Sequence, residues 1–358
     1  MSAHDYPRLQ LGWHLGSAGD PVEIELLTPQ IANHTAILAQ SGSGKSFLVG
    51  RLVEEILLKT RCRVLILDAN GGFRNVGEVA DRPWQEEHRS RWPRLAGGEA
   101  ATREEFEQRW KALVPVARLR EDGDYRIPFG LLLCENQAAL LGIDPAREPS
   151  AYAMLANTDR ELFDETGGGY APAELLAAVE SREGSGGAAG QGTWAARAAA
   201  DRVTTALQRV QTWAHIWAPP DGVCDLEQQV AAGDWRLAVL DLPSLWADLP
   251  SAQGEWARMV VTLYTLEAVL SQANEGWRTA MGYGRAERRP LFVVIDEAHN
   301  FAPAEPRDAL TGLVSERIRR CAAEGRKYGL FLVLITQRPA KMAPGLLAEC
   351  ENVCLLRL

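Results

Sequence analysis

The sequence predicts an α/β fold, in which helices flank a mainly parallel sheet that carries a mostly helical insertion. Short apolar runs typical of buried strands alternate with segments of helical periodicity, and several runs end at a polar or glycine-rich turn. The length of 358 residues leaves room for a large core and an insertion. The expected strands cover residues 35–38, 63–67, 236–241, 291–295, 330–335 and 353–358. Helices are expected after the first strand and at about residues 253–272 and 307–327.

The segment of residues 76–235 interrupts this alternation. It carries charge clusters, tryptophans and a Gly/Ser-rich stretch at residues 183–192, where we expect a flexible loop. We interpret it as a mostly helical insertion on a core made of residues 34–75 and 236–358, preceded by a short lead-in of residues 1–33. The last expected strand reaches the final residue, which indicates a short or missing C-terminal continuation.

Composition and charge exclude several classes of protein. The net charge of −9 and the pI near 5.4 provide no global positive field for nucleic acid or anionic lipid, so such contacts need a local patch. The six scattered cysteines argue against a disulfide scaffold and a paired zinc motif. The N-terminus lacks the organisation of a signal peptide, and no apolar run is long enough for a spanning helix. We therefore expect a cytoplasmic protein without a membrane segment.

The stretch AQSGSGKS, residues 39–46, lies between an expected strand and an expected helix and is typical of a phosphate-binding loop. In such a turn, backbone N–H groups and the positive end of the helix surround the phosphates. Lys45 would reach the β and γ phosphates of ATP, and the Ser46 hydroxyl would complete the Mg²⁺ shell. The nucleotide-binding residues that we expect are Ser41, Gly42, Ser43, Gly44, Lys45, Ser46 and Phe47.

Ala39 stands where this motif usually begins with glycine. We expect the change to be tolerated, because the position ends a strand and alanine excludes only backbone angles with positive φ. Gly42 and Gly44, which lie closest to the phosphates, are kept. For the loop taken alone, the alternative interpretation is a glycine-rich turn before an ordinary helix.

A second motif, LFVVIDE at residues 291–297, is an apolar strand that ends in two acids. A carboxylate at a strand end can hold Mg²⁺ through water, which is the role we assign to Asp296. Glu297 can orient and deprotonate the water that attacks the γ phosphate, and such a base favours hydrolysis over kinase chemistry. The alternative is a strand that ends in solvated acids.

Gln337 follows the strand expected at residues 330–335, with only Thr336 between them. Open parallel sheets place ligand contacts at the carboxyl ends of their strands, so the amide of Gln337 could contact both the γ phosphate and the attacking water. It would then sense which nucleotide is bound. The alternative is an ordinary turn residue before Pro339.

The helix at residues 307–327 combines a basic face with an apolar stripe made of Leu310, Leu313, Val314, Ile318 and Cys321. Six basic residues stand against three acidic ones, a local net charge of +3 in an acidic chain. Arg319 and Arg326 project away from the apolar stripe. We expect that one of them is donated to the ATP of a neighbouring subunit, which typically raises the rate about 10³- to 10⁵-fold. A solvated basic face is the alternative interpretation.

Three segments together resemble one family. HTAILAQSGSGKS, VVIDEAHNFAP and EGRKYGLFLVLITQRPAKM are similar to motifs of the HerA/FtsK superfamily of hexameric DNA-pumping ATPases, on the HerA side. The resemblance implies a RecA-like core, a homo-oligomeric ring of six subunits with ATP sites between them, and double-stranded DNA in the pore. It also implies a nuclease or another effector protein as partner.

By position, the resemblance gives nucleotide roles to Lys45, Ser46, Asp296, Glu297 and Gln337. Arg326 resembles the arginine that acts across the subunit boundary, with Arg319 as the second choice. The sequence departs from the family at Gly72, where an acid is common. It also departs in a lead-in too short for the usual N-terminal β-barrel and in the absence of the usual C-terminal segment.

Three functions remain open at this stage. The first is an ATP-driven DNA translocase or helicase that serves as the motor of a repair or anti-phage complex. The second is an ATPase ring that acts as a regulatory scaffold for an effector enzyme, which the acidic net charge favours over free DNA binding. The third is a secretion or conjugation ATPase, which the absence of a membrane segment disfavours.

Overall fold

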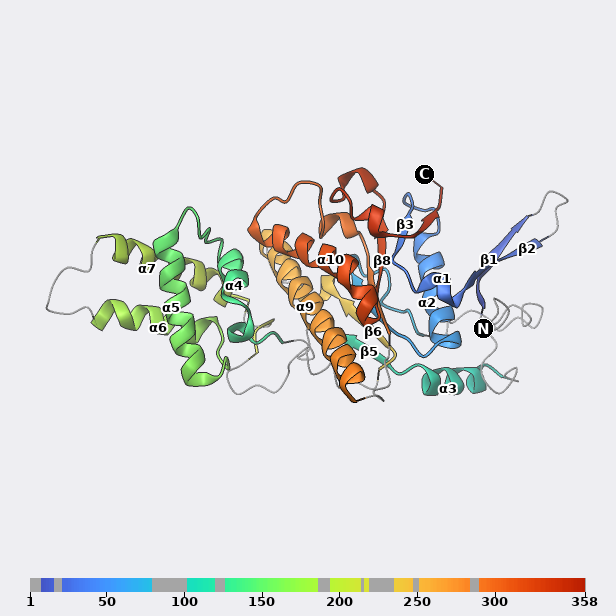
Figure 1. Ribbon diagram of the computed structural model, residues 1–358, viewed down its shortest axis with the longest axis horizontal. Coiled ribbons are helices and arrows are strands. Elements are labelled where there is room, and N and C mark those ends of the chain that lie inside the picture. The colour runs from blue at the N-terminus through green and yellow to red at the C-terminus, as the bar shows by residue number, and fades with distance from the viewer. Residues whose placement is uncertain are drawn as a thin grey trace.

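The computed structural model describes residues 8–15, 21–78, 102–119, 126–185, 194–213, 216–218, 235–246, 251–283 and 290–357. Its centre is a seven-stranded sheet in the order β5-β6-β4-β7-β8-β3-β9, and all neighbouring strands are parallel (Figure 1). The strands are β3 (Thr35–Leu38), β4 (Arg63–Asp68), β5 (Val116–Leu119), β6 (Leu237–Asp241), β7 (Leu291–Ile295), β8 (Leu330–Thr336) and β9 (Asn352–Leu355). The α/β class expected from the sequence is therefore confirmed.

Helices cover both faces of the sheet, and alternating strand side chains hold them there. The covering helices are α2 (Lys45–Lys59), α3 (Arg103–Leu113), α9 (Ser251–Tyr283) and α10 (Ala309–Tyr328). Along β4, Val64 and Ile66 belong to the buried cluster that contains the apolar residues of α2 and α3. Leu65 and Leu67 belong to the cluster on the other face, with α9 and α10. Because strand side chains alternate between faces, the central strands contribute to both cores, whereas the edge strand β9 packs Cys354 on one face and exposes Val353 and Leu355.

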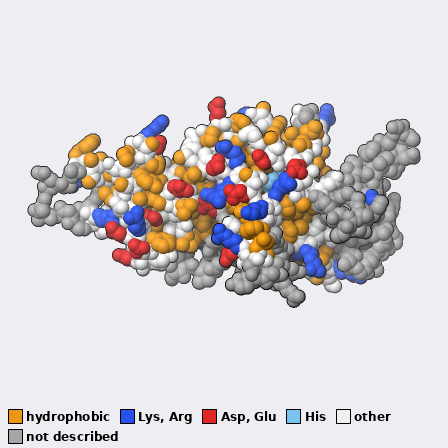
Figure 2. Space-filling model, in the orientation of Figure 1, with side chains coloured by type: hydrophobic (Ala, Val, Ile, Leu, Met, Phe, Trp, Pro, Cys, Tyr) orange, Lys and Arg blue, Asp and Glu red, His pale blue; other side chains and the backbone are white. Residues whose placement is uncertain are grey.

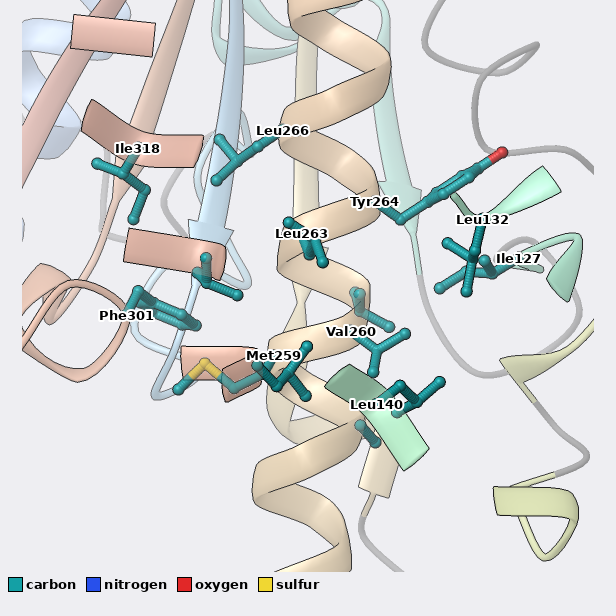
Figure 3. Close-up of a cluster of buried hydrophobic side chains, with 14 of the residues drawn as sticks. Ile127, Leu132, Leu140, Met259, Val260, Leu263, Tyr264, Leu266, Phe301 and Ile318 are labelled. Atoms are coloured by element: carbon teal, nitrogen blue, oxygen red, sulfur yellow. The ribbon is translucent and has the colours of Figure 1, made fainter. Parts of the chain in front are cut away.

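Four helices form a group beside the sheet (Figure 1, green). They are α4 (Cys134–Leu141), α5 (Pro149–Thr166), α6 (Pro172–Ser185) and α7 (Trp194–Gln211). Their junction with the sheet layers is apolar: Leu132 and Leu140 lie near Val260 and Tyr264 of α9 in one buried cluster (Figure 3). This group is therefore packed against the core rather than attached by a linker alone.

The segment of residues 76–235 also supplies part of the central layers. Val116–Leu119 forms β5, which pairs with β6 at one edge of the sheet, and Trp110 of α3 is buried in the cluster with α2. The sequence did not indicate this strand, because VARL is short and includes a charged residue. Of the Gly/Ser-rich stretch, residues 183–185 end α6 and residues 186–192 lie outside the described residues. The division into a core and an insertion stays a prediction.

The lead-in contains a hairpin that the sequence pattern did not reveal. Its elements are β1 (Arg8–Leu15) and β2 (Pro21–Leu27), which pair antiparallel, followed by the short helix α1 (Thr28–Ile31). Strand β1 is fixed to α2 by the buried carboxylate of Glu55, which accepts the N–H of Gln10 at 2.8 Å and pairs with Arg51 and Lys59. Two cations and a backbone donor compensate the burial of this charge.

Helix α9 continues well beyond residue 272, where its expected apolar periodicity ends. The additional turns mix polar, small and apolar residues that are at least partly exposed at residues 273–281, so no continuous apolar stripe indicated them. Among the described helices, none combines the length and the apolar character that are needed to cross a lipid bilayer.

Gly325 and Gly312 of α10 form a matched pair for testing how this helix packs. A Cβ at Gly325 would lie 2.9 Å from the carbonyl oxygen of Leu330, so alanine forces α10 away from β8. A Cβ at Gly312 would come no closer than 3.9 Å to Pro306 Cβ. We expect Gly325→Ala to lower the free energy of unfolding by about 1–3 kcal/mol and Gly312→Ala to raise it by about 0.5–1 kcal/mol. Urea denaturation measures both, and equal shifts would contradict the assigned packing.

Candidate active site

The loop expected to bind phosphate joins the end of β3 to the start of α2. Gly42 and Gly44 have φ angles of 76° and 86°, in the left-handed region that glycine adopts without strain. A Cβ at either position would meet no atom within 4 Å, so the loop faces open space. Ala39 is buried and donates its N–H to the carbonyl of Thr336 at 3.2 Å. Its φ is not positive, because Glu297 alone among the described non-glycine residues has a positive φ. Alanine therefore suits this position, as expected.

The parallel sheet brings the acidic motif to this loop. In the strand order, β7 and β8 lie between β4 and β3, so the carboxyl ends of these strands meet at one edge. Asp296 and Glu297 directly follow β7. The Nζ atom of Lys45 lies 3.1 Å from Asp296 Oδ1 and 2.7 Å from Glu297 Oε1. The side chains of all three residues are mostly buried, which strengthens the attraction between their charges.

Gln337 joins the loop to this charged cluster. Its Nε2 atom donates to Glu297 Oε1 at 2.5 Å, and its Oε1 atom accepts a hydrogen bond from Ser41 Oγ at 2.5 Å. A continuous set of contacts therefore runs from Ser41 through Gln337, Glu297 and Lys45 to Asp296, which we call the active-site network. It unites residues from three of the segments that the sequence motifs singled out.

Burial and charge act against each other in this network. Burial raises the pKa of the Asp296 carboxyl, and the nearby ammonium of Lys45 counteracts part of that effect. Burial also lowers the pKa of Lys45, but its hydrogen bond to Glu297 and the charge of Asp296 outweigh burial, so the net direction is upward. Lys45 therefore carries a positive charge at neutral pH.

Ser46 and Asp296 are the residues that would hold Mg²⁺. The hydroxyl of Ser46 is exposed at the first turn of α2, and a Cβ at Gly72 would lie 3.9 Å from it. The second oxygen of Asp296, Oδ2, lies 3.4 Å from Asn70 Nδ2. Hydroxyl and carboxylate oxygens are the hard ligands that Mg²⁺ prefers, with water and phosphate oxygens completing its shell. The donor set and the open glycine loop fit a nucleotide bound with Mg²⁺.

Of the expected nucleotide ligands, Ser41 and Lys45 belong to the active-site network, whereas Gly42, Ser43, Gly44, Ser46 and Phe47 do not. The side chain of Phe47 is 81% exposed on the first turn of α2. The hydroxyl of Ser43 donates to the carbonyl of Gln40 at 2.7 Å, within the loop itself. Their contacts with a nucleotide stay a prediction.

The two candidate arginines lie away from this network. Arg326 is about half exposed and pairs with Glu351, whereas Arg319 lies 3.7 Å from Glu316. Helix α10 ends just before the amino end of β8, and Gln337 follows its carboxyl end. Seven residues of extended chain separate these two edges of the sheet by roughly 20 Å. Arg326, near the end of α10, therefore does not reach the active-site network of its own chain, and Arg319 in the middle of α10 pairs within its own helix.

Three polar residues near the site were not singled out from the sequence. Asp68 ends β4 and accepts the N–H groups of Gly72 and Phe73 at 3.0 and 2.8 Å, which shapes the turn beside Ser46. Burial raises the pKa of Asp68, although these hydrogen bonds oppose the change. Asn70 contacts Asp296, and His299 approaches Glu297. All three lie at or just after the carboxyl end of a central strand, and this position is the signal that could have found them.

Removing the ammonium of Lys45 tests the electrostatic balance of the site. In Lys45→Ala, the carboxyls of Asp296 and Glu297 lose their shared counter-charge, so the pKa of Asp296 should rise further above its ordinary value of 3.8. An acid whose pKa is higher in the folded state than in the unfolded state destabilises the fold as the pH rises from the unfolded-state pKa to the folded-state pKa. We expect the free energy of unfolding to fall by roughly 3 kcal/mol near neutral pH. The decrease should be much smaller when the pH approaches the ordinary pKa of an aspartate.

Urea denaturation of the parent and the variant across the acidic to neutral range measures this difference. Lys111→Ala, which changes an exposed lysine of α3, is the control for removal of a positive charge. A destabilisation of Lys45→Ala that stays constant with pH would contradict the assigned balance.

Comparison with known proteins places this geometry in a family. The model of the central domain of helicase HerA matches residues 9–229, more than half of the chain. A probable helicase of Methanocaldococcus jannaschii is 32% identical over 99 residues, which are 28% of this chain and 18% of that protein. The DNA double-strand break repair helicase HerA of Pyrococcus furiosus is 37% identical over 70 residues, 19% of this chain and 12% of that protein. The matched segments thus span less than a fifth of these relatives.

Solved structures with the same fold include VirB4 and TrwB. VirB4 of Thermoanaerobacter pseudethanolicus has a TM-score of 0.57 and 17% identity, covering 97% of this chain and 84% of that chain. The bacterial conjugative coupling protein TrwB has a TM-score of 0.55 and 16% identity, covering 97% of this chain and 73% of that chain. These similarities identify the RecA-like P-loop fold expected from the sequence. Together with the match of the family model, they establish that the chain belongs to the HerA central-domain family.

Proposed function

We propose that this chain is the ATP-hydrolysing subunit of a HerA-type DNA translocase or helicase. The observation that carries the proposal is the active-site network, in which one lysine of a phosphate-binding loop contacts two buried acids while a glutamine joins one acid to the loop. A phosphate-binding lysine, a magnesium-binding acid, a base and a sensor are the groups that hydrolysis of ATP requires.

Lys45 gives this network two states. Its ammonium neutralises Asp296 and Glu297 in the structure, and the same ammonium is the group that contacts the β and γ phosphates of ATP. When Lys45 contacts phosphate, Asp296 becomes free to hold Mg²⁺ and Glu297 becomes free to accept a proton from water. Mg²⁺ would neutralise charge that develops on the phosphate oxygens. Nucleotide binding would thus prepare the base for its reaction.

Gln337 connects that change to the rest of the sheet. Because it contacts Ser41 and Glu297 together, a movement of the loop alters the hydrogen bond that the base receives. We assign to Gln337 the role of sensor for the γ phosphate. This assignment explains why a neutral amide lies between the loop and the base, since it can donate to one group and accept from another.

The variant Glu297→Gln tests the assignment of the base. An amide of the same size keeps the shape of the site and cannot accept a proton, so we expect ATP to bind while hydrolysis falls by roughly 100-fold or more. The measurements are equilibrium binding of ATP and release of phosphate. Glu305→Gln, which changes an exposed acid after the same strand, is the matched control. Turnover of Glu297→Gln at the parental rate would show that another group is the base.

The assembly belongs to this proposal as well. We propose a homo-oligomeric ring, in the HerA manner a hexamer, in which Arg326 completes the ATP site of the adjacent subunit and Arg319 is the second choice. Both arginines are exposed on α10, which packs on the opposite face of the sheet from α2, the helix that begins at Lys45. This placement supports a role between subunits rather than within one. Such an arginine would neutralise charge on the transferred phosphate and make hydrolysis depend on assembly.

Double-stranded DNA is the substrate that we propose for the ring, with a nuclease or another effector as partner in DNA repair or anti-phage defence. The names of the curated relatives as repair helicases support the first part. Basic and acidic side chains are interspersed over the middle of the face in Figure 2, so DNA contact needs a local cluster of cations rather than a broad positive surface.

The salt dependence of DNA-stimulated ATP hydrolysis separates a motor from a regulatory scaffold. If DNA phosphates are bound by several cations, stimulation should be strong at low salt and should fall steeply, by roughly 10³-fold in apparent DNA affinity between 50 and 200 mM salt. The assay measures phosphate release against duplex concentration at several salt concentrations, with Glu297→Gln as the control for contaminating ATPases. Hydrolysis that does not respond to DNA at any salt concentration would favour the scaffold.

A further inference from the structure

The carboxylate of Glu297 has one fully engaged oxygen and one without a hydrogen bond. Oε1 accepts from Lys45 Nζ at 2.7 Å and from Gln337 Nε2 at 2.5 Å. Oε2 is buried and has no hydrogen-bond partner. A buried, unpaired carboxylate oxygen is costly, so its presence at this position points to a functional reason. Oε2 is therefore the oxygen of Glu297 whose hydrogen-bonding capacity is unused in this structure.

One side chain approaches this oxygen. The Nδ1 atom of His299 lies 3.4 Å from Glu297 Oε2 and 3.0 Å from the hydroxyl oxygen of Thr336. The backbone explains the approach, because Glu297 adopts a left-handed φ of 48° and begins a tight turn of residues 298–300. This turn folds His299 back beside Glu297. Strain at a non-glycine residue is retained where the surrounding structure requires that geometry.

The hydroxyl of Thr336 can accept from or donate to Nδ1, so the neighbouring carboxylate of Glu297 is the group that decides where the ring hydrogen lies. The Thr336 oxygen accepts the N–H of Arg338 at 2.9 Å, so it lies within hydrogen-bond distance of two nitrogens. Burial, and then the nearby cations Arg338 and Lys341, lower the pKa of His299 against the opposing charge of Glu297, so a neutral ring predominates at neutral pH. A neutral ring carries one hydrogen. On Nδ1, this hydrogen faces two oxygens. On Nε2, it would leave a bare Nδ1 lone pair facing a carboxylate.

We propose that His299 is a positioning residue for the base, holding its hydrogen on Nδ1 between Thr336 Oγ1 and Glu297 Oε2. In that arrangement the imidazole limits rotation of the carboxylate and keeps Oε2 directed towards the attacking water. The carboxyl end of β8 then positions both oxygens of Glu297. Gln337, directly after the strand, contacts Oε1, and Thr336 holds the imidazole ring beside Oε2. This inference rests on the proposed role of Glu297 and adds a residue to which that proposal gives no role.

Two replacements of His299 distinguish positioning from simple packing. The amide of asparagine can supply a donor at the place of Nδ1, whereas the longer glutamine places its amide near Nε2. We expect His299→Asn to keep single-turnover hydrolysis within about threefold of the parent and His299→Gln to reduce it by roughly 10- to 100-fold. The dissociation constant for ATP should stay within about twofold in both variants, because His299 contacts the base and not the phosphate loop. Equal rates in the two variants would overturn the proposal, whether both fall or both stay.

A second measurement is independent of hydrolysis. Long-range ¹⁵N–¹H correlation spectra of the parent distinguish a hydrogen on Nδ1 from one on Nε2, and the His299→Asn spectrum assigns the signal. We expect the Nδ1–H form, and an Nε2–H form would overturn the proposal. The two proposals also fail differently. If Glu297→Gln hydrolyses ATP normally, the proposed base is wrong. If Glu297→Gln is inactive and the ring is Nε2–H, only the role of His299 is wrong.

Discussion

The contact of one lysine with two neighbouring carboxylates governs this site. Asp296 and Glu297 are buried side by side at the end of β7, where like charges repel strongly in a medium of low polarity. Lys45 makes the arrangement tenable, because its ammonium lies within 3.1 Å of both. The start of α2 is thereby tied to the end of β7. In the proposed reaction, a nucleotide that engages Lys45 disturbs this balance, so binding of phosphate would be coupled to activation of the acids.

The parallel sheet is what allows so many loops to share that contact. Four strands that are adjacent in the sheet, β4, β7, β8 and β3, end at one edge and supply Asn70, Asp296, Gln337 and Ser41. Two apolar layers hold the strands in register, with Val294 packed towards α2 and Val293 towards α10. Since interiors are close-packed, a shift of one strand would change the hydrogen bonds of its neighbours. The close packing of the core thus fixes the relative positions of the polar residues at the carboxyl edge of the sheet.

The active-site network and the candidate arginine Arg326 lie at opposite edges of the sheet, which has a consequence for the proposed function. The active-site network occupies the carboxyl edge, whereas Arg326 lies near the amino edge and pairs with Glu351. In the proposed ring, the ATP site of one subunit receives Arg326 from the adjacent subunit, because its own Arg326 lies at the opposite edge of the sheet. Hydrolysis would then require contact between subunits. Within a subunit, the proposed link from Thr336 through His299 to Glu297 would add a second control of the base from strand β8.

The sequence by itself determined the features that depend on near neighbours: the glycine loop, the apolar strands that end in Asp296 and Gln337, and the buried stripe of α10, where Leu310, Val314 and Ile318 lie as expected. Only the tertiary structure decided which of these groups touch. Lys45 meets Asp296 across 251 residues and Ser41 meets Gln337 across 296, distances over which local periodicity carries no information. The same reason hid β5, whose four residues become a strand through pairing with β6. It also hid His299, whose contacts come from the turn after β7 and from the end of β8.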